Sequence, residues 1–178
     1  MDSALFNFLH SWASISAVSD WFIIVAARYL PWGLALMALV LVFKSSSPVK
    51  RLENLIFIAL TLLVSRGFLT ELIRYFVERP RPFVALGFEP LVEQSMTYAF
   101  PSGHAAIFFA LALAVWFIDR KWGYWFGGLA LINGLARVIA GVHWPTDIVA
   151  GAVVGALSVL AVYWILKKVP RTVKVSAS

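Results

Sequence analysis

The chain has 178 residues, of which 61% are hydrophobic and 13% are charged, and its mean hydropathy is +0.85. A soluble domain is about half apolar and about a quarter charged, so this composition excludes an ordinary soluble domain and indicates an integral membrane protein. The sequence contains no cysteine, which excludes disulfides, thiol nucleophiles and thiolate metal sites.

The formal net charge of +6 raises the question of a nucleic-acid partner. Nucleic-acid-binding domains gather their cations on one face or along one helix. Here the cations stand between apolar runs, so membrane topology explains them better and we expect no nucleic-acid partner.

The first predicted element is an amphipathic helix over residues 2–18. Apolar residues recur at steps of three and four from Leu5 to Ile15, with Ser, Asn and His between them. This pattern is typical of a helix that lies in the membrane interface. A re-entrant segment or a sixth crossing helix is the alternative interpretation.

Longer apolar runs follow, each close to the roughly 20 residues that a helix needs to cross a bilayer. They predict an all-α fold, a polytopic membrane helix bundle with five transmembrane helices. The chain has no internal repeat or low-complexity tract, so residues 1–178 are expected to form a single membrane-embedded domain. The apolar runs are residues 20–43, 53–77, 102–118, 122–142 and 147–166.

The positions of the cations predict the orientation of these helices. Short cytoplasmic loops are enriched in lysine and arginine, and cations follow the first, third and fifth runs. We therefore expect these ends and the C-terminus to be cytoplasmic, with the loop 78–101 and the N-terminal helix outside. The cations are Lys44, Lys50, Arg51, Arg120, Lys121, Lys167, Lys168, Arg171 and Lys174.

Other arginines are predicted near the outer membrane surface. Arg74, Arg79 and Arg81 follow the second run, and Arg137 lies within about two turns of the outer end of the fourth. An arginine in hydrocarbon is costly unless it reaches the headgroups or pairs with an anion, and Glu71 and Glu78 are nearby partners. A cluster on one face instead favours a phosphate site, because guanidinium groups bind phosphate oxygens bidentately.

The segment "FPSGHAAIFF" predicts a helix N-terminus on the same face. Ser102 stands where it can cap the helix, and Gly103 would let an anion approach the free backbone N–H groups. His104 then lies in the first turn, beside such an anion. A histidine at a helix start also fits a purely structural role.

Arg137, His143 and Asp147 form the third candidate group. A carboxylate four residues from a histidine, across a helix start, can fix the imidazole tautomer so that the other ring nitrogen can attack. The alternative is a capping aspartate beside an interfacial histidine. A metal site made of His104, His143 and Asp147 is formally possible, but the nearby arginines would repel a cation, so we expect no metal.

In chain order, "R-x6-RP", "PSGH" and "AR-x5-H-x3-D" resemble the three-part signature of the type 2 phosphatidic acid phosphatase family. The motifs span residues 74–147. The second Arg-Pro pair, which begins at Arg81, is then the motif pair, and Arg79 is an additional cation. The chain departs from the family at two positions, since Arg74 stands where lysine is usual and Ala136 where serine is usual.

This resemblance implies a mechanism without metal or cofactor. His143 would attack phosphorus and form a phosphohistidine, oriented by Asp147, while His104 would protonate the leaving oxygen and then activate water. The remaining residues would bind the phosphate oxygens. They are Arg74, Arg81, Ser102, Gly103 and Arg137, with Arg79 as a further candidate for a second phosphate group.

The resemblance also implies a lipid substrate. The chain is similar to short bacterial members that hydrolyse undecaprenyl diphosphate to undecaprenyl phosphate at the extracytoplasmic side of the cytoplasmic membrane. Phosphatidylglycerol phosphate, phosphatidic acid and lipid A 1-phosphate are the alternative substrates. A small membrane transporter or a structural membrane protein would explain the apolar runs, but not two histidines and an aspartate beside arginines. The expected partners are therefore a lipid phosphate and the membrane itself.

Overall fold

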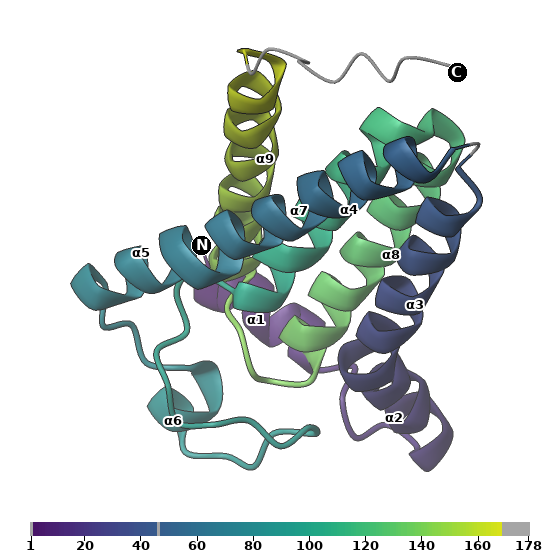
Figure 1. The fold of residues 1–178 in the computed structure, drawn as a ribbon. Coiled ribbons are helices and arrows are strands. Elements are labelled where there is room, and N and C mark those ends of the chain that lie inside the picture. Colours follow the sequence, from purple (N-terminus) through teal and green to yellow (C-terminus); the bar gives the residue numbers. More distant parts are fainter. Residues whose placement is uncertain (1, 46, 169–178) are drawn as a thin grey trace, which may run out of the picture.

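The computed structural model describes residues 2–45 and 47–168, and every regular element within them is a helix (Figure 1). The all-α prediction is therefore confirmed. The π-helical turns η1 and η2 join their neighbours into two long continuous helices. In chain order the elements are α1 (Asp2–His10), α2 (Ala17–Ile24), η1 (Val25–Tyr29), α3 (Leu30–Phe43), α4 (Pro48–Leu62), η2 (Leu63–Leu69), α5 (Thr70–Phe76), α6 (Pro82–Leu86), α7 (Gly103–Ile118), α8 (Arg120–Ile139) and α9 (Pro145–Lys168).

Three helices in the described part of the chain are long and apolar enough to cross a membrane, namely Ala17–Phe43, Pro48–Phe76 and Pro145–Lys168. α7 is apolar but has 16 residues, about 24 Å of helix. α8 has 20 residues but carries two cations in its first turn and Arg137 in its last. The chain is thus a multi-pass membrane helix bundle. The five crossings expected from the sequence require α7 and α8 to span as well, and they stay a prediction.

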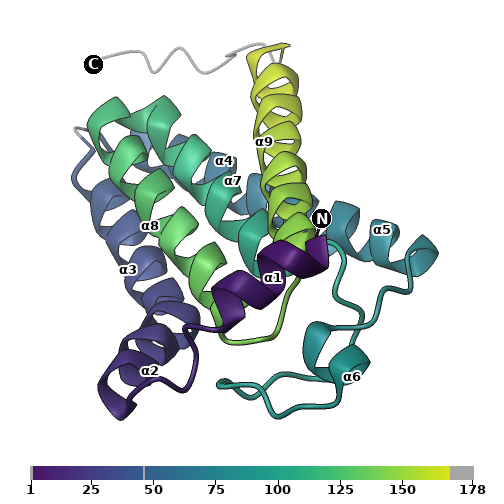
Figure 2. The ribbon, with the colours of Figure 1, turned by 180° about the vertical axis from the view of Figure 1, so that it is seen from behind.

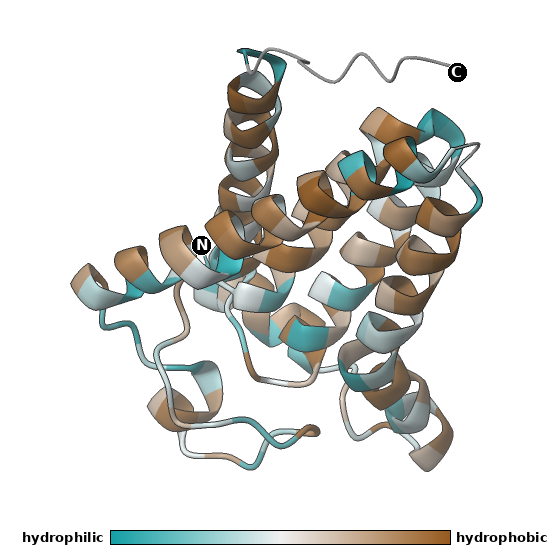
Figure 3. Cartoon of the chain, in the orientation of Figure 1, coloured by the Kyte–Doolittle hydropathy of each residue, from teal (hydrophilic) through white to brown (hydrophobic). Residues whose placement is uncertain are grey.

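The two ends of the bundle differ in what they carry. The α3–α4 turn, the α7–α8 turn and the end of α9 lie at one end, whereas α1, α6 and the turn before α9 lie at the other (Figure 1). Hydrophobic residues dominate the helices between these ends (Figure 3). Of the cations used to predict orientation, Arg171 and Lys174 lie outside the described residues. The others, Lys44, Lys50, Arg51, Arg120, Lys121, Lys167 and Lys168, all belong to the first end.

α7 forms the centre of the fold, since it packs against α8, α9 and α4 and buries more than half of its residues. Small residues let α9 approach it closely. A Cβ on Gly151 of α9 would lie 2.5 Å from the main-chain oxygen of Ser102, at the start of α7. The second turn of α9 is therefore in close contact with the main chain at the start of α7, which brings two of the predicted motifs together.

The N-terminal helix is shorter than the sequence pattern predicts. α1 ends at His10 and α2 begins at Ala17, so the predicted single helix over residues 2–18 is wrong. The reason is local, because the side chain of Ser16 accepts a hydrogen bond from the N–H of Ser19 at 3.1 Å and starts a new helix. α1 itself lies across the end of the bundle, against α8 and α9 (Figure 2).

Candidate active site

Three segments that are distant in sequence meet at the end of the bundle that carries α1. The loop after α5 supplies Arg81, the N-terminus of α7 supplies Ser102 and His104, and the turn between α8 and α9 supplies His143. The N–H of Ser102 donates a 3.0 Å hydrogen bond to the main-chain oxygen of Asp147. This bond joins the second and third sequence motifs directly.

The predicted histidine–aspartate pair is buried, with His143 1% and Asp147 0% exposed. Nδ1 of His143 lies 3.4 Å from Oδ2 of Asp147, and the same oxygen accepts a 2.8 Å hydrogen bond from the N–H of Trp144. The carboxylate therefore caps the start of α9 and also faces the imidazole, so both interpretations of the spacing apply at once. A proton on Nδ1 leaves the lone pair of Nε2 free to attack.

Arg81 stands beside that second ring nitrogen. Its Nη1 lies 3.2 Å from Nε2 of His143 and donates to the carbonyl of Val142 at 3.0 Å. Its Nε donates to the carbonyl of Thr97 at 2.8 Å, and its Nη2 to the hydroxyl of Thr97 at 3.1 Å. The guanidinium group is thus fixed by neutral acceptors, with no carboxylate partner among the described residues.

Arg137 is likewise held by neutral acceptors, whereas Arg74 also has a carboxylate partner, Glu71. Arg137 donates to the carbonyl of Ala27 at 3.3 Å and to the side chain of Gln94. Arg74 donates to the carbonyl of Pro101 at 3.2 Å and forms an ion pair of 3.3 Å with this glutamate of its own helix. The Nε atoms of both arginines are buried and have no hydrogen-bond partner within the described part of the chain. Each arginine thus has one buried N–H group for which the described residues supply no acceptor.

The start of α7 has the features expected of an anion site. Ser102 caps the helix, since its hydroxyl accepts a 3.4 Å hydrogen bond from the N–H of Ala105. A Cβ on Gly103 would lie 2.6 Å from Nε of Arg66, so the missing side chain allows a guanidinium group to lie against the helix terminus. Arg66, to which the sequence assigns no role, thus belongs to the surroundings of the site.

The electrostatic surroundings of the site favour a neutral nucleophile. Burial, followed by the positive charges of Arg137 and Arg81, lowers the pKa of His143 well below its ordinary value. The charge of Arg74 contributes as well. Burial and the charge of Arg74 lower the pKa of Arg81 to about 10, which leaves it protonated at neutral pH.

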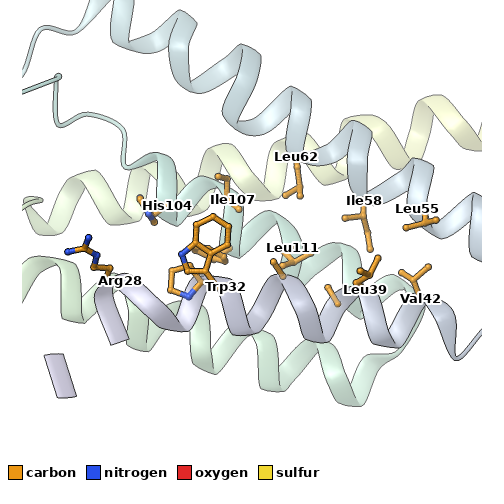
Figure 4. A pocket seen from close by; sticks show the side chains of 14 residues that line it. Arg28, Trp32, Leu39, Val42, Leu55, Ile58, Leu62, His104, Ile107 and Leu111 are labelled. Atoms are coloured by element: carbon orange, nitrogen blue, oxygen red, sulfur yellow. The ribbon is translucent and has the colours of Figure 1, made fainter. Parts of the chain in front are cut away.

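An apolar cavity of about 350 Å³ adjoins the site (Figure 4). His104 and Arg28 line one end of it. From there it continues between α3 and α4, over α7, past Leu62 and Leu111 towards Val42 near the other end of α3. The wall is hydrocarbon except at the end beside the histidine.

Arg79 does not pair with Glu78, the partner that the sequence suggests. Its part in binding a second phosphate group stays a prediction. Its Nη1 donates to Oδ1 of Asp147 at 2.8 Å and to the hydroxyl of Thr146 at 2.7 Å, and its Nη2 pairs with Asp2. Both terminal nitrogens are therefore engaged by protein groups. No sequence pattern indicates Asp2 and Thr146 as partners of Arg79, because these residues lie far apart along the chain.

Within residues 2–45 and 47–168, no group of three or more His, Asp or Glu side chains lies close enough to hold a metal ion. The alternative set of His104, His143 and Asp147 is therefore not assembled as a metal site. The same histidines and aspartate instead share their surroundings with arginines, which suits a bound anion.

Comparison with known proteins gives related sequences. "Bacitracin transport permease protein BcrC" of Bacillus licheniformis is 36% identical over 89 residues, which are 49% of this chain and 44% of that protein. An undecaprenyl-diphosphatase of Sulfolobus acidocaldarius is 32% identical over 122 residues, 67% of this chain and 56% of that protein. The matched regions thus amount to about half the length of these two relatives.

The fold also has a solved counterpart. The crystal structure of Aquifex aeolicus LpxE superposes with a TM-score of 0.72 at 22% identity, over 90% of this chain and 93% of that one, which shows a shared fold. The sequence profile of the PAP2 superfamily matches residues 55–171, a segment that includes all three motifs. The chain therefore belongs to the PAP2 superfamily.

Proposed function

We propose that this chain is a metal-independent lipid phosphatase that hydrolyses undecaprenyl diphosphate to undecaprenyl phosphate and inorganic phosphate. The observation that carries the proposal is a pair of buried arginines. Arg81 and Arg137 are 2% and 3% exposed, and neither has a carboxylate partner within the described residues. A buried charge without a counter-charge is costly. A phosphate group beside both arginines would supply the missing negative charge.

In the first half-reaction, Nε2 of His143 attacks the terminal phosphorus of the diphosphate. The N–P bond forms as the bond from that phosphorus to the bridging oxygen breaks, and protonated His104 gives its proton to this oxygen. Asp147, which faces Nδ1, stabilises the positive charge that the attacking ring acquires. The arginines and the N-terminus of α7 neutralise the phosphoryl oxygens. Undecaprenyl phosphate leaves.

The second half-reaction returns the site to its starting state. His104, now neutral, takes a proton from a water molecule whose oxygen attacks the phosphorus of the phosphohistidine. The P–N bond breaks, inorganic phosphate leaves, and His143 recovers its lone pair. Over the cycle His104 gives up one proton and regains one, while His143 takes up the phosphoryl group and releases it to water. The net reaction is hydrolysis.

The apolar cavity supports a lipid substrate. A phosphate held at the start of α7 would have its leaving group beside His104, at the end of a cavity that is otherwise lined by hydrocarbon. Between α3 and α4 this space suits the first part of one linear hydrocarbon chain. The name of the Sulfolobus relative agrees with a polyprenyl diphosphate as the substrate.

The proposal includes five membrane crossings, made by α2–α3, α4–α5, α7, α8 and α9, and a site on the extracytoplasmic face of a bacterial cytoplasmic membrane. Cations at the opposite end of the bundle support this orientation. Single cysteines in this cysteine-free chain provide the test. Ser95→Cys should react with an impermeant thiol reagent added to intact cells, and Ser47→Cys should not. The reverse pattern would invert the topology.

The activity is tested by phosphate release from undecaprenyl diphosphate in detergent with EDTA present. The wild type should release phosphate and form an acid-labile phosphoenzyme. His143→Gln should lose both, with a rate loss of about 1,000-fold or more. Arg120→Gln, at the other end of the bundle, is the control and should keep the wild-type rate. Full activity of His143→Gln, or activity only with a divalent cation, would refute the mechanism.

A panel of substrates separates the remaining candidates. Phosphatidylglycerol phosphate, phosphatidic acid and lipid A 1-phosphate are assayed beside undecaprenyl diphosphate under the same conditions. The largest kcat/KM should belong to the diphosphate. The name of the Bacillus licheniformis relative would instead suggest transport. A purified chain that hydrolyses none of these lipids would favour that alternative.

A further inference from the structure

Asp2, at the start of α1, is bound to residues far along the chain, at the start of α9 and in the loop after α5. Its Oδ1 accepts a 3.1 Å hydrogen bond from the N–H of Thr146, and its Oδ2 accepts one of 2.7 Å from the hydroxyl of the same residue. Its Oδ2 also pairs with Nη2 of Arg79. One carboxylate at the N-terminus thus binds both the first turn of α9 and the loop that follows α5.

Arg79 carries this connection to the nucleophile. Its Nη1 donates to Oδ1 of Asp147 at 2.8 Å, while the other oxygen of that carboxylate faces the N–H of Trp144 and Nδ1 of His143. Asp147 is therefore held on both oxygens, and its orientation determines that of the imidazole. The chain of contacts runs from Asp2 through Arg79 and Asp147 to His143.

The rest of α1 is packed to keep Asp2 in place. Phe6 is fully buried and its ring lies 5.0 Å from that of Trp144, measured between centroids. Nδ1 of His10 lies 2.7 Å from the carbonyl of Ile139, at the end of α8. The indole of Trp144 in turn lies 5.2 Å below the guanidinium carbon of Arg79 and donates to a loop carbonyl at 3.0 Å. α1 therefore contacts the turn that carries His143 on both sides, at the end of α8 and at Trp144.

The charge of Asp2 is maintained by the same contacts. Burial alone would raise the pKa of Asp2, but the hydrogen bonds from Arg79 and Thr146 outweigh it and lower the pKa. Arg79 thus stands between two carboxylates, and each of its terminal nitrogens binds one of them. Both terminal nitrogens of Arg79 are thus engaged by carboxylates of the protein.

We infer that Asp2 is a positioning residue, which acts through Arg79 to hold Asp147 and so to orient the imidazole of His143. The inference rests on the proposed function, because that function assigns Asp147 and His143 to catalysis. A misplacement of a reacting group by about 1 Å can lower the rate by up to about 100-fold. Asp2→Asn should therefore lower kcat by about 10-fold and leave KM within about twofold, since Asp2 does not touch the substrate.

A double-mutant cycle tests whether Asp2 acts through Arg79. If it does, Asp2→Asn combined with Arg79→Gln should lose no more kcat than Arg79→Gln alone. The control is Asp20→Asn, which removes another carboxylate near the N-terminus whose one hydrogen bond within residues 2–45 and 47–168 comes from the exposed N–H of Ser14. This variant should keep the wild-type kcat. Thermal unfolding in the same detergent establishes that each variant is folded.

The outcomes separate this inference from the proposed function. A wild-type chain that releases no phosphate refutes the proposed function itself. If the wild type is active, an unchanged kcat in Asp2→Asn overturns the positioning role, and so do losses that multiply in the double variant. If Asp2→Asn does not fold, Thr146→Val, which removes the hydroxyl between Asp2 and Arg79, should lower kcat several-fold at constant KM. An unchanged kcat in that folded variant also overturns the inference.

Discussion

Nη1 of Arg81 lies 3.2 Å from Nε2 of His143, the ring nitrogen that attacks phosphorus in the proposed mechanism. The guanidinium group is fixed from behind by Thr97 and Val142. An arginine held in this way does not have to reorganise when charge develops on the transferred phosphoryl group, which is the condition for strong electrostatic stabilisation.

Replacing Arg81 by lysine tests how much the planar guanidinium group, with its several fixed donors, contributes to catalysis. Arg81→Lys keeps the positive charge but cannot bind Thr97 and two phosphate oxygens at once. We expect kcat/KM to fall by about 100-fold, as for the loss of one preorganised donor. Phosphate release measures the effect, with Arg120→Lys as the matched control. A kcat/KM within twofold of the wild type would contradict the assignment.

The protonation of His143 can be followed directly, because the chain has three histidines. Burial and the charges of Arg137 and Arg81 lower the pKa of His143. Its ring resonance in a histidine-labelled sample should therefore not shift between about pH 8 and pH 5, whereas an exposed histidine titrates near about 6.5. His143→Gln identifies the resonance. A midpoint close to the ordinary value would contradict this prediction.

The same lowered pKa affects stability. As the pH falls below about 6.5, the histidine takes up a proton in the unfolded chain but not in the folded one, so the unfolded state gains stability. The contribution of His143 to folding should thus decrease with falling pH until the pH reaches the lowered pKa. Thermal unfolding of wild type and His143→Gln across this range measures it. The stability of the wild type relative to His143→Gln should be greatest near neutral pH and should fall as the pH is lowered.

The close approach of α7 and α9 depends on glycine. In Gly151→Ala the new Cβ would lie 2.5 Å from the main-chain oxygen of Ser102, which cannot move without displacing α7. We expect a loss of about 1–3 kcal/mol in the free energy of unfolding. Gly127→Ala is the matched control, since nothing lies within 4 Å of its Cβ. That variant should be neutral or up to about 1 kcal/mol more stable. Equal stability of the two variants would contradict the packing argument.

Filling the apolar cavity should affect long lipids selectively. Ala35 lines the cavity, and Ala35→Phe would occupy part of it. We expect KM for undecaprenyl diphosphate to rise several-fold, while hydrolysis of a water-soluble phosphate ester stays unchanged. Leu36→Phe is the control, because this neighbouring side chain is 63% exposed and does not line the cavity. Equal effects of both variants on both substrates would exclude the cavity as the lipid site.

Local sequence patterns predicted the parts of the fold that depend on local interactions. Ser102 caps α7 as the Pro-Ser pattern indicates, and the four-residue spacing brings His143 within 3.4 Å of Asp147. The break between α1 and α2 was missed because the apolar spacing continues through it. Only the capping side chain of Ser16 marks the new helix start, and a serine among other small polar residues is a weak signal.

The long-range part of the site could not be predicted from one sequence. Arg79 binds Asp2 and Asp147, at separations of 77 and 68 residues. No periodicity connects such positions, and the nearby Glu78 was the more obvious partner. The apolar cavity is equally hidden, since its lining residues follow the same helical pattern as residues that face lipid.

The hydrogen bond from the N–H of Ser102 to the main-chain oxygen of Asp147 has a mechanical consequence. It ties the helix that carries His104 to the helix start that carries Asp147, and the backbone contact at Gly151 reinforces the tie. The general acid and the nucleophile are therefore carried by two helix starts whose main chains are bonded to each other. The spacing between His104 and Asp147 is thus set by main-chain contacts, independently of the side chains of α3 and α4 that border the cavity.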